Sequence, residues 1–120
     1  MEISATVEEN VAAVAVKGRL DSSNADGLKE RLREMVDSGA PNLVIDLQQV
    51  IYISSAGFRT LLITARTVDQ ARGRMVLCGI AGEVKRLFDV AAFSELFTIV
   101  PTREDALNAL RAPGSGPAAA

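Results

Sequence analysis

The chain has 120 residues, of which 48% are hydrophobic and 23% charged, and its formal net charge is −2. This length suits one globular domain that needs no disulfide or metal for stability, and the charge balance argues against direct binding of nucleic acid. The apolar runs are far shorter than the roughly 20 residues that span a bilayer, and the acidic N-terminal region does not fit a secretory signal. We therefore expect no membrane association and a cytoplasmic location, which the single cysteine, Cys78, also suits.

The N-terminal region predicts a β-hairpin. Apolar residues alternate with polar ones over residues 3–7, and a continuous apolar run covers residues 11–16. A loop over residues 18–22, Gly-Arg-Leu-Asp-Ser, follows the hairpin.

The first predicted helix follows this loop. Ser23 and Asp26 have the spacing of a capping box, with aspartate in place of glutamate, and Gly39 and Pro41 end the helix. Its predicted core face consists of Ala25, Leu28, Leu32 and Met35/Val36.

Two continuously apolar segments, residues 43–47 and 75–78, predict strands that are covered on both faces or central in a sheet. The segment between them predicts an amphipathic helix that ends near Gly73. The apolar residues at helical spacing are Phe58, Leu61, Leu62, Ala65 and Val68.

The C-terminal region predicts a short helix after Gly79, a last strand over residues 97–100, and a final helix. Thr102 and Asp105 have capping-box spacing at the start of that final helix. We expect the tail, residues 112–120, to be disordered. The predicted inward-facing residues are Val84, Leu87, Phe88 and Ala91 in the short helix, and Leu107 and Leu110 in the final one.

A hairpin followed by repeated strand–helix units predicts an α/β domain over residues 1–111, with right-handed crossovers and a mixed, mostly parallel sheet.

The residue types do not indicate an enzyme. The chain has no histidine, the usual general base and metal ligand, so we predict no catalytic residues, no metal site and no cofactor. Asp46, Glu8 and Glu9 are a poor match for the acidic cluster of a response-regulator receiver, because no lysine follows the last strand. The turn 79–82 carries two glycines, and we interpret it as a tight turn rather than a phosphate-binding loop.

Ser54 and Ser55 lie where the strand passes into the amphipathic helix. A serine at this position can cap the helix by accepting a hydrogen bond from a free backbone N–H. A hydroxyl at a helix N-terminus can also carry a phosphate, since the terminus favours negative charge. The residues alone leave both interpretations open, for either serine.

The residues that follow the serine pair add some support for a binding role. Ala56 and Gly57 are small, which would allow the backbone of another protein to come close to the hydroxyls. Arg59, Arg66 and Gln70 form a polar helix face beside the junction.

Four segments together resemble the STAS domain family, and specifically bacterial anti-sigma factor antagonists. The resemblance runs in order from about Ile3 to Leu110, and the Ser-Ser-Ala-Gly stretch is its most specific part. The four segments are residues 18–21, 43–47, 52–57 and 84–88.

The resemblance implies a sheet of about five strands with about four helices mainly on one side, and binding rather than catalysis. It implies an anti-sigma factor serine kinase as the partner, which phosphorylates Ser55 (Ser54 is the alternative), and a serine phosphatase that reverses the modification. Some relatives carry aspartate and glycine where this chain has Ile53 and Ala56. The partner-binding residues expected on this basis are Asp21, Ser22, Ser54, Ser55, Ala56, Gly57 and Arg59.

Two alternatives remain at this point. A STAS protein that regulates a secretion or signalling complex would use the same switch without a sigma factor. A nucleotide-binding protein or small hydrolase would use the turn 79–82 and the junction at Ser54 and Ser55, but the absence of histidine and of a phosphate-loop lysine argues against it.

Overall fold

The computed structural model describes residues 1–111, apart from the side chain of Phe93, and the predicted disordered tail lies outside this part of the chain. The elements follow one another as β1 (Glu2–Glu8), β2 (Val11–Leu20), α1 (Ala25–Asp37), β3 (Asn42–Ile53), α2 (Ser55–Gln70), β4 (Met75–Cys78), α3 (Gly82–Val90), a 3₁₀ turn (Phe93–Leu96), β5 (Thr98–Val100) and α4 (Arg103–Arg111). Within the described residues, no helix is both long enough and apolar enough to cross a membrane.

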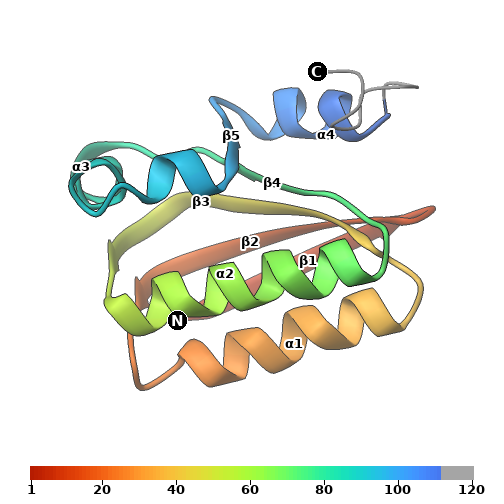
Figure 1. Cartoon of the computed structure of the whole chain (residues 1–120), viewed down its shortest axis with the longest axis horizontal. Coiled ribbons are helices and arrows are strands. Elements are labelled where there is room, and N and C mark those ends of the chain that lie inside the picture. Colours follow the sequence, from red (N-terminus) through yellow and green to blue (C-terminus); the bar gives the residue numbers. More distant parts are fainter. Residues whose placement is uncertain (112–120) are drawn as a thin grey trace.

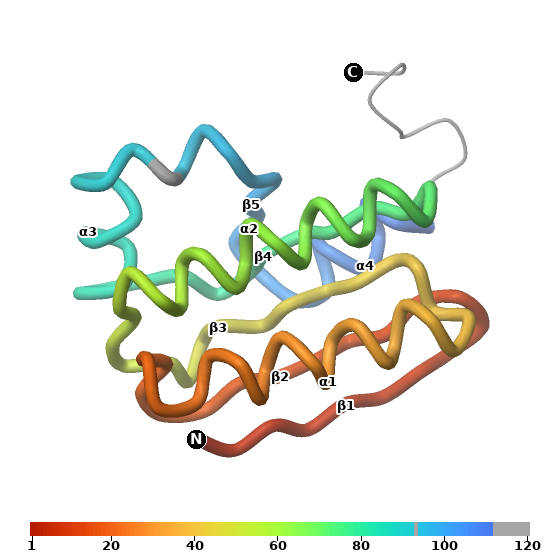
Figure 2. Tube along the Cα trace, turned by 60° about the horizontal axis from the view of Figure 1, so that its bottom comes forward, coloured from red at the N-terminus to blue at the C-terminus, as the bar shows by residue number. Residues whose placement is uncertain are grey.

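The strands form one five-stranded sheet in the order β1-β2-β3-β4-β5. β1 and β2 are antiparallel, and every later pair is parallel. Helices α1 and α2 lie against one face of this sheet, and α4 lies on the opposite face (Figures 1 and 2). The predicted mixed, mostly parallel sheet with helices mainly on one side is therefore confirmed.

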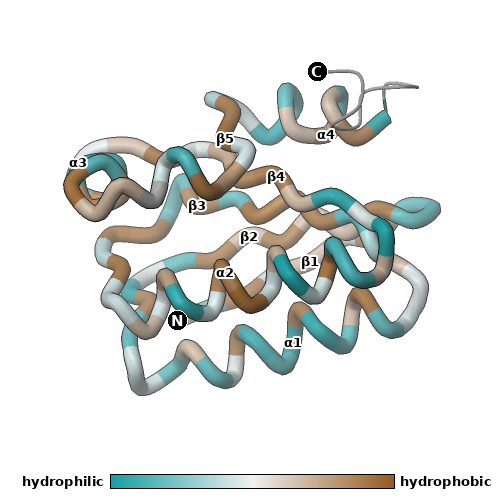
Figure 3. Tube along the Cα trace, in the orientation of Figure 1, coloured by the Kyte–Doolittle hydropathy of each residue, from teal (hydrophilic) through white to brown (hydrophobic). Residues whose placement is uncertain are grey.

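The core has two parts because the sheet is covered on both faces. The larger part lies between the sheet and helices α1, α2 and α3 and includes fully buried Leu28, Ile45, Leu61 and Phe88. The smaller part lies under α4. The central strands are correspondingly brown over much of their length in Figure 3, whereas α1 alternates between teal and brown. The buried residues under α4 are Ala13, Val44, Val76, Cys78 and Ala106.

The start of α1 differs from the prediction. The residue before the helix is Asn24, not Ser23, and its side chain makes no capping hydrogen bond. Instead the Asn24 amide accepts a hydrogen bond from the Asp21 N–H at 3.0 Å and donates one to the Arg19 carbonyl at 2.8 Å. The capping box predicted for Ser23 and Asp26 is therefore wrong, because the side chains at this end organise the preceding loop.

Two further boundaries are informative. β3 runs six residues beyond the predicted end at Leu47, through the exposed pair Gln48 and Gln49, to Ile53. Ala91, predicted to face the core, is exposed, since α3 ends at Val90. The cap predicted at the last helix is confirmed in part: the Asp105 N–H donates to the Thr102 hydroxyl at 3.1 Å.

Candidate functional site

The candidate site lies at the edge of the sheet where the parallel strands β2 and β3 both end. Leu20 and Ile53 are register partners at these ends, and the Ser54 N–H donates to the Leu20 carbonyl at 2.9 Å. The loop that begins at Asp21 and the first turn of α2 therefore lie at the same edge, although more than 30 residues separate them in the chain.

Ser54 is the N-cap of α2. Its backbone is extended, with φ −93° and ψ 174°, and its side chain accepts a hydrogen bond from the Gly57 N–H at 3.3 Å. This bond satisfies one of the backbone N–H groups that have no partner within the helix. Ser54 is half-buried. Of the two interpretations of the serine pair, the helix cap therefore applies to Ser54.

Ser55 has different surroundings. It is the first residue of α2, and its side chain is exposed. Within residues 1–111 no hydrogen bond to its hydroxyl is formed. Its hydroxyl is consequently free to react or to contact another molecule, and the helix terminus next to it favours added negative charge.

The Asp21 loop is held together by short polar contacts. The Asp21 carboxylate accepts hydrogen bonds from the Ser23 hydroxyl at 2.6 Å and from the Ser23 N–H at 3.0 Å. These bonds, with a smaller effect of Arg19 at 4.0 Å, hold the pKa of the Asp21 carboxyl below its ordinary value. Asp21 is half-buried and Ser22 exposed, so the loop presents an ionised carboxylate and a free hydroxyl.

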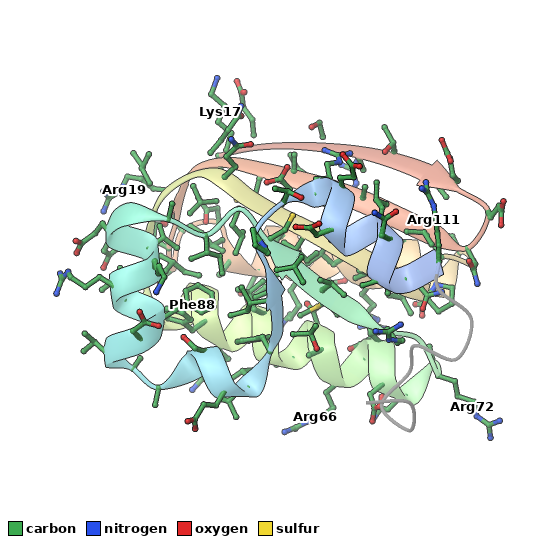
Figure 4. All side chains as sticks on the ribbon, turned by 90° about the horizontal axis from the view of Figure 1, so that it is seen from above. Lys17, Arg19, Arg66, Arg72, Phe88 and Arg111 are labelled. Carbon is green, nitrogen blue, oxygen red and sulfur yellow. The ribbon has the colours of Figure 1, made fainter. Side chains whose placement is uncertain are left out.

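Arg19 and Tyr52 form a contact that the sequence did not predict. The Arg19 guanidinium lies 4.4 Å from the centre of the Tyr52 ring, within the range of a cation–π interaction. The two residues are register partners on β2 and β3, and Figure 4 shows Arg19 at the outside of the molecule. Only knowledge of the strand register could have identified this pair.

Gly57 does not lie on the surface, contrary to the expectation that it would give a partner room. It is buried, and a Cβ atom at this position would lie 2.8 Å from Ile53 Cγ1 and 2.9 Å from Leu20 Cγ. The glycine therefore allows the first turn of α2 to pack closely against the strand ends. Ala56, its half-buried neighbour, remains partly accessible.

The polar face of α2 is as predicted at three positions. Arg59, Arg66 and Gln70 are exposed, and Figure 4 shows Arg66 pointing away from the body of the protein. Thr60, the residue next to Arg59, is buried with 3% exposure, and its hydroxyl donates to the Ala25 carbonyl at 3.1 Å. Thr60 thus links α2 to α1.

Asp46 lies on β3 and forms an ion pair on the face of the sheet that α4 covers. Its carboxylate lies 3.8 Å from the Arg103 guanidinium of α4. Burial raises the pKa of the neighbouring Cys78 thiol to about 11, and the Asp46 carboxylate adds to the rise. Within residues 1–111 no group of histidine, cysteine, aspartate and glutamate side chains is arranged to hold a metal ion.

In the turn after β4, the Gly79 N–H is hydrogen-bonded within the protein. Gly79 has a φ of +75°, and its N–H donates to the Pro101 carbonyl at 3.1 Å. An N–H that is already bonded in this way is not free for a phosphate, which supports the interpretation of a tight turn.

The sheet order, the serine-bearing helix start and the adjacent acidic loop define a small α/β domain with a hydroxyl and a carboxylate at one edge of its sheet. The STAS domain model matches residues 2–106, and the chain belongs to the STAS domain family. The resemblance found in the sequence is confirmed.

Individual relatives point to one branch of this family. BtrV of Bordetella bronchiseptica, named provisionally as an anti-sigma factor antagonist, is 32% identical over 111 residues, which are 92% of this chain and 96% of BtrV. An anti-sigma factor antagonist from Mycobacterium paratuberculosis has a similar crystal structure, with a TM-score of 0.82, 26% identity, and coverage of 92% of this chain and 94% of that one.

The antagonist SpoIIAA has the same fold at lower identity. Its unphosphorylated form gives a TM-score of 0.72 at 16% identity, covering 92% of this chain and 98% of that one. The phosphorylated form from Bacillus gives 0.71 at 14% identity, covering 92% of this chain and all of that one.

Proposed function

We propose that this protein is an anti-sigma factor antagonist that binds an anti-sigma serine kinase while Ser55 is unmodified and loses this affinity when Ser55 is phosphorylated. The observation that carries the proposal is the exposed Ser55 hydroxyl at the start of α2, beside the Asp21 loop. Binding and release of the kinase would control the availability of a sigma factor.

The proposed surface follows the edge of the sheet. It combines the carboxylate of Asp21 and the hydroxyls of Ser22 and Ser55 with the cation of Arg59, all of which are at least partly exposed. Ser54 and Ala56, both half-buried, complete it, and Gly57 supports it from beneath.

A phosphate changes this surface strongly. Phosphoserine carries a charge of about −1.5 to −2 at neutral pH and three acceptor oxygens. In a complex this charge must be desolvated, and beside an acidic group of the partner it is repelled. Because about 1.4 kcal/mol corresponds to a tenfold change in affinity, one phosphate is sufficient to dissociate a micromolar complex.

The same modification need not disturb the fold. Ser55 is not part of the core, and an anion is favoured at a helix N-terminus. The similarity of the chain to SpoIIAA in both its phosphorylation states, with TM-scores of 0.71 and 0.72, supports a fold that accommodates either state.

The proposal includes three further parts. We propose that the protein acts in the cytoplasm, that it works by binding and not by catalysis, and that it needs no cofactor. A serine phosphatase reverses the modification, since the exposed position of Ser55 leaves it accessible to a second enzyme.

The test is a phosphorylation assay with the candidate kinase and ATP, followed by mass-spectrometric mapping of the modified residue. Ser54→Ala and Ser55→Ala form the matched pair. We expect phosphate on the wild type and on Ser54→Ala, and none on Ser55→Ala. Phosphate on Ser54 alone, or on neither serine, would overturn the proposal. A titration of modified and unmodified protein against the kinase then measures the loss of affinity.

A further inference from the structure

We propose that Arg59 binds the phosphate once Ser55 is modified, so that one modification removes two groups from the partner-binding surface. The inference rests on the proposed function and concerns the regulation of the same site.

The spacing of the two residues places them together. Ser55 and Arg59 lie one turn apart on α2, and both side chains are exposed. Residues four apart in a helix have Cβ atoms about 5–6 Å from each other. A guanidinium with several N–H donors matches the oxygens of a phosphate and forms charge-assisted hydrogen bonds with them.

Arg59 is available for this role. Some other arginines of the protein are engaged in ion pairs, such as Arg86 with Glu83 and Arg103 with Asp46. Within residues 1–111 no ion pair or side-chain hydrogen bond involves Arg59. The guanidinium can therefore turn to the phosphate without breaking an existing contact.

A contact between the phosphate and Arg59 weakens partner binding more than the added negative charge would by itself. In the unmodified protein the Arg59 guanidinium can contact an acidic group of the partner. In the modified protein it is neutralised by the phosphate on Ser55, so the partner meets a new anion and loses a cation at the same place.

Arg66 provides a matched control on the same helix. It is exposed, it has no ion pair within residues 1–111, and it lies two turns beyond Arg59. Its distance of 11 residues from Ser55 corresponds to about 16 Å along the helix axis, which is beyond the reach of a contact with the phosphate.

The experiment uses the full chain with phosphoserine incorporated at position 55 during synthesis, so that no kinase is needed. The second ionisation of the phosphate is titrated by phosphorus NMR in wild type, Arg59→Gln, Arg59→Lys and Arg66→Gln. We expect Arg59→Gln to lower the proton-dissociation constant of the phosphate about twofold, as the loss of an exposed ion pair between residues four apart in a helix predicts. Arg59→Lys should restore part of this effect.

Equal titration curves for Arg59→Gln and Arg66→Gln would overturn the inference. That result would leave the proposed function intact, because phosphorylation of Ser55 by the kinase is measured separately. Conversely, a kinase that does not modify Ser55 would refute the proposed function without changing the titration.

Discussion

Ser54 and Ser55 are adjacent and chemically identical, but the first turn of α2 gives their hydroxyls different surroundings. The Ser54 side chain accepts the Gly57 N–H at 3.3 Å and is half-buried, whereas the Ser55 side chain is exposed. A structural role and a regulatory role can therefore belong to neighbouring residues without conflict.

This difference predicts opposite outcomes for two alanine substitutions. Ser54→Ala should lower the free energy of unfolding by about 1 kcal/mol because α2 loses its cap. Ser55→Ala should leave stability unchanged within about 0.5 kcal/mol, since the exposed hydroxyl makes no structural contact. Urea denaturation of both variants measures the difference, and equal losses would contradict these assignments.

At the scale of the elements, the position of α2 depends on a close approach to two strand ends. Gly57 lies where a Cβ atom would be 3.1 Å from the Leu20 carbonyl as well as close to two side chains. In α1, by contrast, a Cβ at Gly27 would meet no atom within 4 Å. The two glycines are both helical, so they differ mainly in the space around them.

We expect Gly57→Ala to destabilise the protein by about 1–3 kcal/mol through overpacking. Gly27→Ala should stabilise it by about 0.5–1 kcal/mol, because alanine favours the helix and no atom blocks the added methyl group. Thermal or denaturant unfolding checks both signs. A stabilising effect of Gly57→Ala would show that α2 can move away from the strands at little cost.

Helix α4 closes the other face of the sheet over Cys78. The buried thiol, with its pKa raised to about 11, is protonated at neutral pH, and the thiolate is the reactive form.

We expect slow labelling of Cys78 by a thiol reagent at pH 8 in the native protein and rapid labelling in urea. Leu107→Ala, which removes apolar packing under α4, should speed native labelling. Replacing exposed Asn108 by alanine is the control. Rapid labelling of the wild type would mean that α4 does not protect Cys78.

At the scale of the whole molecule, the exposed groups of the site lie at an edge of the sheet, outside the cores on its two faces. The Asp21 loop and the start of α2 extend beyond the ends of β2 and β3, while the largest buried side chains lie between the sheet and its helices (Figure 1). A charge added at this edge can alter the surface without entering a core.

Phosphorylation of Ser55 should therefore preserve the fold. We expect the melting temperature to rise by about 1–5 °C, because an anion at a helix N-terminus contributes about 0.3–1 kcal/mol. Calorimetry of the protein with and without phosphoserine at position 55 measures this change. A clear fall in melting temperature would mean that the modification acts by unfolding α2 and not by blocking a partner.

Much of this architecture follows from the local pattern of residues. Apolar periodicity predicts the strands and helices, because a strand repeats every two residues and a helix every 3.6. The Ser-Ser-Ala-Gly stretch predicts a helix start after a strand, and the resemblance it carries to the STAS family is confirmed. The short apolar runs already argued against a bilayer-spanning helix, and residues 1–111 contain none.

The environments within the site depend on contacts between distant segments, which periodicity does not encode. Pairing of β2 with β3 brings Arg19 over Tyr52 and directs Gly57 toward Leu20. Helix geometry makes Ser54 the cap and leaves Ser55 exposed. Strand register and the packing of α2 decided which residues are exposed at this edge of the sheet, because the direction of each side chain depends on the segment that lies beside it.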